Sequence, residues 1–353
     1  MRFEELPEAD YPEWDAFVDG SVEKSPFSKL AWLQAHRENS SRHSFSIAVV
    51  RDKVGEIAAG VALLKRSKPV SSEDLVVPPL HPYNSLLLRP LTTQEPNRIY
   101  TSRSSYASAL VEFLRAQNFF SCRLIHHPRL DDVRPFLWDG WRISPAYTFL
   151  VNLRTIEGVS SFTPSYRTRY RKCVEEGYRM ATAASVCDAL PRFMPLINAT
   201  YRRRGMEPGD YGLDGLPGYL RTLDTQKALL YFEATNPQGK VVAARILVPA
   251  ADGQVYDWVA GTDPEHLKSG VTVFLVVEIL LELQRRGFRA FDFGGANTPG
   301  VADFKQGFNG SLVFGFDTQL PPASTRNRLI AAAADGAHRF RQIVRTATLK
   351  NRR

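Results

Sequence analysis

The order of the predicted strands and helices repeats in the two halves of the chain. Each half begins with a hairpin, over 45–64 and over 229–248, and ends with a long helix followed by a short strand. A third strand lies between the hairpin and the helix, at 83–88 and at 255–260. The halves share this order but not residue identity. The repeat predicts two α/β units, each with a mixed, mostly antiparallel sheet and one long crossover helix.

The length and the charge distribution divide the chain further. A chain of 353 residues suits two domains of roughly 150 residues each, with a boundary expected near 145–155. We therefore predict an N-terminal domain at 1–150, a C-terminal domain at 151–320 and a basic helical tail at 321–353. The tail holds +7 of the chain's net charge of +8, from Arg326, Arg328, Arg339, Arg341, Arg345, Lys350, Arg352 and Arg353 against Asp335.

The basic tail alternates apolar residues with arginines near helical spacing, which favours an amphipathic helix. Such a helix either closes the fold in solvent or contacts an anionic membrane surface or RNA phosphates. The start of the chain lacks the apolar core of a signal peptide, and the longest apolar run, 271–283, is too short to span a bilayer. We expect a cytoplasmic protein, and leave open a peripheral contact with the inner membrane face.

The cysteines and histidines indicate neither a disulfide framework nor a metal site. Cys122, Cys173 and Cys187 are scattered, without a CxxC pair. The seven histidines lack the spacing that metal sites use. We therefore predict no metal.

A glycine turn followed by one lysine stands out in the second unit, at 291–310. The turn follows a short strand, and loops at strand ends commonly bind ligands. Gly294 and Gly295 let the backbone approach a ligand closely, while Phe304 is expected to face the core beside Lys305. Lys305 is either a functional cation or a lysine at the end of a short helix with its head group in water.

The strand, helix and strand with a glycine turn resemble the unit of the GNAT acyltransferase superfamily. Two such units in tandem resemble the Fem family, whose enzymes append amino acids to peptidoglycan precursors, together with the related BioF2-like acyltransferases. The segments that carry the resemblance are 169–177, 201–205, 285–295 and 300–308, the last with a Phe-Lys signature. They cover the second half well, whereas the first half matches only in pattern.

The resemblance implies roles for individual residues. Lys305 would stabilise the oxyanion that forms when an amine attacks an ester or thioester. Asp292 and Tyr256 are candidates for the general base, as are Asp303 and Asp257, and each of them could instead be structural. The residues expected to contact an anionic acceptor or the donor are Gly294, Gly295, Phe304, Arg169, Arg171, Lys172, Arg203 and Arg245. The basic clusters could equally be solvated helix faces.

The loop before the second long helix leaves the donor open. Lys268 and Gly270 lie in it, but it lacks the second small residue of loops that hold the CoA pyrophosphate at a helix N-terminus. The resemblance therefore implies an N-acyltransferase without a tightly bound cofactor, using an aminoacyl-tRNA or an acyl-CoA as co-substrate. An acyl-CoA enzyme acting on a small amine, sugar or lipid is the second hypothesis. A non-catalytic protein that binds RNA or precursors is the third.

Overall fold

The computed structural model describes residues 1–320, except 40–41, 68–72, 78–79, 118, 204 and 206–214. The strands are β1 Glu4–Glu5, β2 His43–Arg51, β3 Ile57–Ser67, β4 Glu73–Leu75, β5 Leu87–Leu88, β6 Ser121–Ile125, β7 Arg142–Asn152, β8 Arg179–Ala183, β9 Leu230–Thr235, β10 Val241–Pro249, β11 Gln254–Thr262, β12 Ala290–Asp292 and β13 Ser311–Leu320. The helices are α1 Tyr11–Gly20, α2 Leu30–Glu38, α3 Pro96–Ala116, α4 Arg134–Trp138, α5 Pro164–Glu175, α6 Val186–Arg203, α7 Leu216–Thr225, α8 Val271–Arg285 and α9 Pro299–Gln306. The tail predicted at 321–353 lies outside the described residues.

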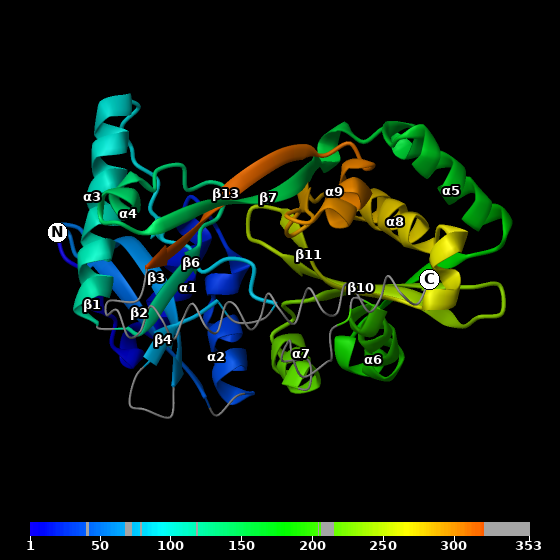
Figure 1. The fold of residues 1–353 in the computed structure, drawn as a ribbon, viewed down its shortest axis with the longest axis horizontal. Coiled ribbons are helices and arrows are strands. Elements are labelled where there is room, and N and C mark those ends of the chain that lie inside the picture. The colour runs from blue at the N-terminus through cyan, green and yellow to red at the C-terminus, as the bar shows by residue number, and fades with distance from the viewer. Residues whose placement is uncertain are drawn as a thin grey trace.

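One continuous sheet runs through both halves in the order β1-β2-β3-β4-β6-β13-β7-β12-β11-β10-β9-β8. Only β4–β6 and β11–β12 pair in parallel among the described strands, so the predicted mixed, mostly antiparallel sheet is confirmed. The long antiparallel pair of β7 and β13 joins the halves, as the green and orange arrows of Figure 1 show. The boundary expected near 145–155 falls within β7, which pairs with β12 through its last residues.

Helices cover both faces of the sheet in the second half. Alternate residues of β10 point to opposite faces: Ala243 and Leu247 pack with α5 and α8, whereas Ala244 and Ile246 pack with α6 and α7. Figure 1 shows α5 and α8 on one side of the strands and α6 and α7 on the other. The core between β10 and the helices α6 and α7 also contains Phe27, Trp32 and Tyr83, so apolar residues of the first half pack directly on the second.

Two predicted elements of the first half differ from the structure. The strand expected at 83–88 is reduced to Leu87–Leu88, because Asn84 bonds the neighbouring backbone through its side chain, accepting from the Ile125 N–H at 2.7 Å and donating to the Arg123 carbonyl at 3.2 Å. The helix expected at 106–115 begins at Pro96, a residue suited to the first helical position, and its first turns are too polar to show apolar periodicity.

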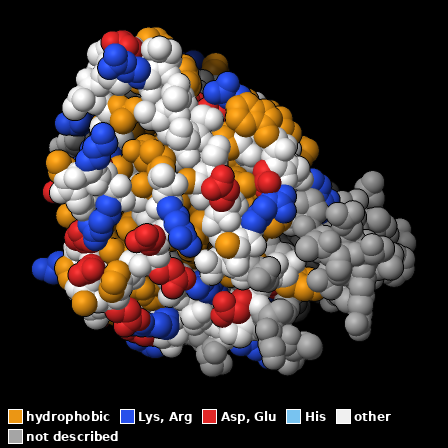
Figure 2. All heavy atoms as spheres, turned by 90° about the vertical axis from the view of Figure 1, so that its left-hand side faces the viewer, with side chains coloured by type: hydrophobic (Ala, Val, Ile, Leu, Met, Phe, Trp, Pro, Cys, Tyr) orange, Lys and Arg blue, Asp and Glu red, His pale blue; other side chains and the backbone are white. Residues whose placement is uncertain are grey.

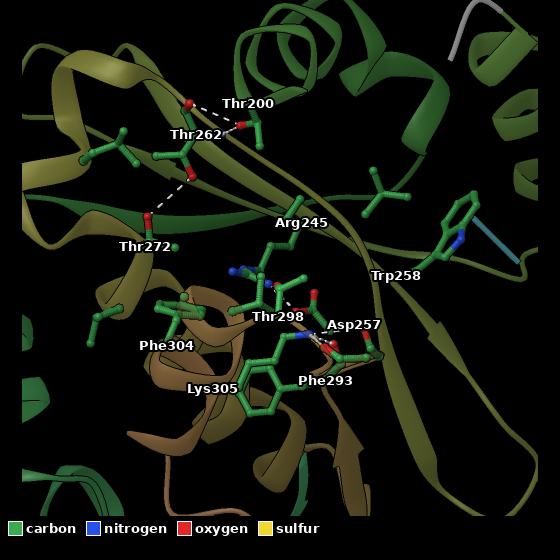
Figure 3. Close-up of a pocket in the computed structure, with 18 of the residues that line it drawn as sticks. Thr200, Arg245, Asp257, Trp258, Thr262, Thr272, Phe293, Thr298, Phe304 and Lys305 are labelled. Atoms are coloured by element: carbon green, nitrogen blue, oxygen red, sulfur yellow. Dashed lines mark hydrogen bonds and ion pairs between the residues drawn. The ribbon is translucent and has the colours of Figure 1, made fainter. Parts of the chain in front are cut away.

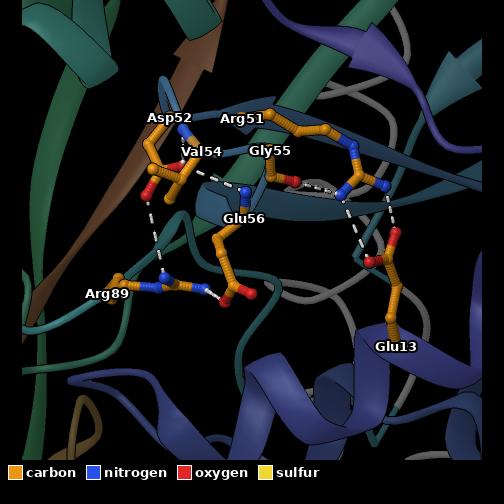
Figure 4. A network of polar contacts seen from close by, with 7 residues as sticks. All are labelled: Glu13, Arg51, Asp52, Val54, Gly55, Glu56 and Arg89. Carbon is orange, nitrogen blue, oxygen red and sulfur yellow. Dashed lines mark hydrogen bonds and ion pairs between the residues drawn. The ribbon is translucent and has the colours of Figure 1, made fainter.

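Ion pairs hold the turn between β2 and β3 against its neighbours (Figure 4). Asp52 accepts a hydrogen bond from the backbone N–H of Glu56 at 3.0 Å, Arg89 pairs with Glu56 at 2.9 Å, and Arg51 pairs with Glu13 of α1. Such exposed pairs contribute little to stability. On this side of the molecule acidic and basic side chains are intermixed, as Figure 2 shows, so the described residues form no large area of one sign on this face.

Substitution of Gly261 tests the packing of α6 on β11. A Cβ at Gly261 would lie 2.5 Å from the backbone nitrogen of Ile197 and 2.6 Å from the carbonyl carbon of Leu196, so the helix would have to move away. We expect Gly261→Ala to lower the free energy of unfolding by about 2 kcal/mol in urea denaturation, as overpacking does. Gly20→Ala is the matched control, since nothing lies within 4 Å of its Cβ position. Equal stability of the two variants would contradict this packing.

Candidate functional site

The parallel pair of β11 and β12 ends where the candidate site begins. The pairing stops at Tyr256 and Asp292, and the chain after β12 turns away at Gly294 and Gly295, whose φ angles are 63° and 85°. These angles favour glycine. Residues 257–262 of β11 then form one wall of a cavity of about 610 Å³, and the turn at 293–295 forms another. Ligand sites commonly have this volume.

A β-bulge shapes the wall that β11 contributes. Leu247 of β10 pairs with Asp257 and Ile246 pairs with Val259, so Trp258 is an extra residue without a partner on β10. A bulge changes the direction of the side chains around it. Asp257, Trp258 and Val259 all line the cavity as a result.

Lys305 lies at the cavity with its ammonium group held by the glycine turn. Its Nζ donates hydrogen bonds to the carbonyls of Phe293 at 2.6 Å, Gly294 at 3.1 Å and Gly295 at 2.5 Å. An ammonium group has three N–H donors, so these bonds occupy all of them. The residue is 8% exposed, which contradicts the alternative of a helix-end lysine with its head group in water. The structure therefore fixes a positive charge at the cavity wall.

Helix α5 positions the short helix α9 that carries Lys305. Tyr166 donates its hydroxyl proton to the carbonyl of Phe304 at 2.6 Å, and its ring packs against the Cα of Gly307, where a Cβ would lie 2.4 Å from the ring. Thr163 also donates to the carbonyl of Gly307, at 3.1 Å. Helix α5 therefore supports the site, and Gly307 is needed for this close approach.

Asp292 holds the glycine turn from behind and does not line the cavity. Its carboxylate accepts from the Thr148 hydroxyl at 2.6 Å, the Gly294 N–H at 2.8 Å and the Tyr83 hydroxyl at 3.3 Å. Burial raises the pKa of Asp292, while the hydrogen bond from Thr148 opposes that change. Through Tyr83, a residue of the first half supports the turn that carries the carbonyls around Lys305.

Tyr256 also lies outside the cavity lining. Its hydroxyl forms a hydrogen bond with Nε2 of His127 at 3.0 Å, and burial raises the pKa of Tyr256 well above its usual value. The catalytic roles suggested for Asp292 and Tyr256 therefore remain predictions, and both side chains have structural partners. Of the two, only Asp292 bonds directly to the turn.

The predicted basic clusters are divided by the structure. Arg169 and Arg203 line the cavity, whereas Arg171 and Lys172 do not, and Lys172 pairs with Glu176 at 3.7 Å. Lys268 is exposed on the 3₁₀ helix Pro264–Ser269 and also lies outside the lining. The next arginine after Arg203 in the sequence, at position 204, falls outside the described residues.

Arg245 lies in the cavity wall together with Asp257. The two side chains form an ion pair and are 7% and 6% exposed, and the guanidinium of Arg245 lies 5.9 Å from the ring centroid of Phe304. Among the described residues that line the cavity, Arg169, Arg203, Arg245 and Lys305 carry positive charge and Asp257 alone carries negative charge. Such an excess of positive charge attracts anionic ligands.

Gly270 ends the loop before α8 in a left-handed conformation, with φ of 92°. Arg169 packs on it, because a Cβ at Gly270 would lie 3.0 Å from the Cβ of Arg169. The Val271 N–H donates to the Ser269 hydroxyl at 3.2 Å, and the Cys173 thiol donates to the Ser269 carbonyl at 3.3 Å. The N-terminus of α8 therefore lies beside an arginine, an arrangement that favours negative charge.

Threonines that no sequence pattern identifies form one end of the cavity. Thr200 of α6, Thr262 of β11 and Thr272 of α8 come from three separate elements (Figure 3). Thr200 accepts from the Thr262 N–H at 3.0 Å, and the hydroxyls of Thr262 and Thr272 lie 3.5 Å apart. Their meeting depends on how α6 and α8 cross β11, which no local pattern encodes.

Comparisons with known proteins agree with this architecture. Residues 160–306 match the family model of the acetyltransferase (GNAT) domain. No curated protein matches the chain significantly. Among solved structures the chain is similar to FemX, with a TM-score of 0.66 and 11% identity over 90% of this chain and 97% of that one.

Two further structures have the same fold. L-PGS from Bacillus licheniformis has a TM-score of 0.52 and 15% identity over 93% of this chain and 96% of its own. A tandem GNAT protein from the clavulanic acid biosynthesis pathway has a TM-score of 0.52 and 13% identity over 90% and 97%. The predicted tandem fold is confirmed: the chain has the fold of FemX and of tandem GNAT proteins, and residues 160–306 match the acetyltransferase (GNAT) domain.

Proposed function

We propose that the protein is an N-acyltransferase that moves an aminoacyl or acyl group to an amine of an anionic acceptor, such as a cell-wall precursor. The observation that carries the proposal is Lys305, a buried cation that three backbone carbonyls hold at the wall of the cavity. A positive charge held beside the donor carbonyl stabilises the oxyanion of acyl transfer. The reaction takes place in the second half of the chain.

The step follows from this geometry. The acceptor nitrogen attacks the donor carbonyl carbon, a C–N bond forms, and the carbonyl oxygen becomes an oxyanion near Nζ of Lys305. Since the three Nζ donors are occupied, Lys305 gives up one carbonyl to bond the oxyanion, and the bond to Gly294 is the longest at 3.1 Å. The intermediate then releases the alcohol or thiol of the donor, which takes a proton, while the amine loses one. Arg169 and Arg203 would hold the phosphate or carboxylate groups of the substrates.

Two observations support an aminoacyl-tRNA over an acyl-CoA as donor. The loop before α8 forms a 3₁₀ helix, and the hydroxyl of Ser269 in this loop accepts the hydrogen bond from the N–H of Val271. Arg169 packs against Gly270, at the position where CoA-binding loops leave backbone N–H groups free to bind the pyrophosphate.

A lipid acceptor is the second candidate, because exposed apolar side chains lie beside the site. Leu312 and Phe314 of β13 are 57% and 50% exposed, and Tyr147 of β7 packs against Phe314 with ring centroids 5.8 Å apart. The backbone of Tyr147 bonds the loop after the glycine turn, accepting from the Ala296 N–H at 2.6 Å. An apolar surface of this kind marks an interaction site.

The predicted contact of the basic tail with anionic membranes would serve the same acceptor. No helix in the described part of the chain is long and apolar enough to cross a bilayer.

A donor and acceptor panel tests the proposal. A ligand that binds only the folded state raises its stability. We expect an aminoacylated RNA minihelix to raise the melting temperature and a CoA thioester at equal concentration to leave it unchanged. Transfer is then followed with radiolabelled amino acid to a soluble peptidoglycan precursor and to phosphatidylglycerol vesicles. Stabilisation by the CoA thioester alone would favour an acyl-CoA enzyme, and label in the vesicles alone would make the lipid the acceptor.

A further inference from the structure

We infer that Asp257 is an ammonium-binding residue of the cavity, which receives the positively charged amino group of a substrate. The inference rests on the proposed function in one respect, since acyl transfer to an amine supplies substrates of this kind. Two sources of the ammonium group are possible: the α-amino group of an aminoacyl donor, and the amine of the acceptor before it loses its proton. The chemistry that Asp257 recognises is the same for both.

The carboxylate of Asp257 has one oxygen committed and one without a partner. Oδ2 accepts from Nη1 of Arg245. Oδ1 is buried and receives no hydrogen bond from any described residue. A buried acceptor left unsatisfied costs about 1–3 kcal/mol, and more when it is charged, so natural structures rarely keep one without a reason. Arg245 therefore satisfies only one of the two carboxylate oxygens of Asp257.

The position of Asp257 directs this carboxylate to the cavity. It follows directly on Tyr256, the last residue of β11 that pairs with β12, and it precedes the bulge at Trp258. Its side chain is 6% exposed, and it lines the cavity. Figure 3 shows it in the part of the cavity that also contains Arg245 and Lys305. The terminal torsion of an aspartate is broad and roughly two-fold, so a rotation can turn one oxygen toward a ligand while the other stays on Arg245.

Asp257 supplies the one acidic group among the described charged side chains of the cavity. The other charged side chains that line the described cavity are the basic ones of Arg169, Arg203, Arg245 and Lys305. An anionic group is attracted by those four and repelled by Asp257, and an apolar acyl chain leaves the carboxylate unsatisfied. An ammonium group can enter this cavity only where a carboxylate meets it. A charge-assisted hydrogen bond to Oδ1 would satisfy both groups.

The consequence is selectivity for substrates with an amino group. Sites built to bond a polar group discriminate strongly against an analogue that lacks it, because the buried acceptor stays unpaired. We expect L-alanine amide, which carries the ammonium group, to bind at least tenfold more tightly than propionamide, which has the same shape without it.

Equilibrium binding of these two probes tests the inference without any need for turnover. Binding to the full chain is measured by NMR at neutral pH for the wild type, Asp257→Asn and Asp263→Asn. Asp263 is the matched control, since it also forms an ion pair, with Lys240 at 2.8 Å, but does not line the cavity. The preference for alanine amide should vanish in Asp257→Asn and persist in Asp263→Asn. Equal affinity of the wild type for both probes would overturn the inference.

A second variant guards against a folding defect. Asp257→Asn leaves Arg245 buried without its carboxylate, so Arg245→Met with Asp257→Asn removes both charges together. This double variant should be folded by circular dichroism and should bind both probes equally. If it keeps the preference for alanine amide, the ammonium site lies elsewhere and the inference fails.

Transfer assays then identify the source of the ammonium group. Alanyl and propionyl groups on the same carrier are compared with one acceptor. If Asp257→Asn lowers the transfer rate of the alanyl group alone, the site belongs to the donor. If it lowers the rates of both groups equally and raises the KM for the acceptor, the site binds the acceptor amine. An equal loss with the acceptor KM unchanged would mean a structural role and would overturn the inference. If the wild type transfers neither group, the proposed function fails, but the binding comparison still decides the role of Asp257.

Discussion

Replacing Lys305 with Met is expected to lower turnover at least a hundredfold. The ammonium group lies in the cavity wall, and the proposed reaction develops negative charge on the donor oxygen beside it. Removal of one fixed oxyanion donor in other acyl-transfer enzymes costs a factor of about 10²–10³. A hundredfold loss corresponds to about 2.7 kcal/mol of transition-state stabilisation. Single-turnover rates with the donor and acceptor from the panel measure it.

The hydrogen bonds of Lys305 make a stability control necessary. The carbonyls of Phe293, Gly294 and Gly295 lose their shared donor in Lys305→Met, so the glycine turn should loosen and the melting temperature should fall. Rates are therefore compared at temperatures where both proteins are fully folded. Lys240→Met is the matched control, because Lys240 is an ion-paired lysine away from the cavity. Turnover of folded Lys305→Met within tenfold of the wild type would contradict the assignment.

The elements that the sequence predicts well are those whose signals are local. The hairpin of β9 and β10, the helix α8 and the glycine turn before Lys305 were all identified from apolar periodicity and glycine positions within short windows. Lys305 can be singled out because it follows the glycine turn and belongs to the Phe-Lys signature. The structure buries it, and its catalytic role stays a prediction.

The features that escaped prediction depend on contacts between distant segments. The pairing of β13 with both β6 and β7 joins residues 161 to 198 positions apart in the sequence, and no local pattern specifies it. Asp292 was a candidate base because it ends a strand beside a glycine turn. Its partners Thr148 and Tyr83, which lie far away in the sequence, are what place the carboxylate behind the turn.

A second large effect is expected from pH, because the first half buries neutral histidines. Burial lowers the pKa of His81, His126 and His127 to about 3. In the unfolded chain a histidine titrates near 6.5, so between pH 6.5 and 3 the unfolded state binds more protons and the free energy of unfolding falls as the pH falls. From pH 6.5 to 5 the loss is about 2 kcal/mol for each of these histidines.

One buried carboxyl group opposes this loss. Burial raises the pKa of Glu23 to about 7, so between pH 4.5 and 7 the folded state binds its proton more tightly than the unfolded chain does. Its contribution to the free energy of unfolding therefore rises as the pH falls, by about 2 kcal/mol between pH 6.5 and 5. The three histidines outweigh it, and a net loss of about 3 kcal/mol remains over this interval.

The positions of these histidines indicate where acid acts first. His81 contacts His36, whose Nε2 forms a hydrogen bond with the Tyr219 hydroxyl of α7 at 2.9 Å, and His127 bonds Tyr256 of β11. Both contacts join the first half to the second, close to Tyr83, which supports Asp292 behind the glycine turn. Protonation at these contacts should therefore disturb the turn that holds Lys305 as well as the global fold.

Urea denaturation at pH 7 and pH 5 measures the predicted loss, and Glu23→Gln separates its two components. In that variant the opposing carboxyl is absent, so the fall in free energy between the two pH values should be larger than in the wild type. A wild-type difference below about 1 kcal/mol would contradict the burial of neutral histidines as the dominant titration. If activity at pH 5 is lost reversibly before the fold is, acid acts through the junction between the halves, because that junction supports the turn on which the proposed chemistry depends.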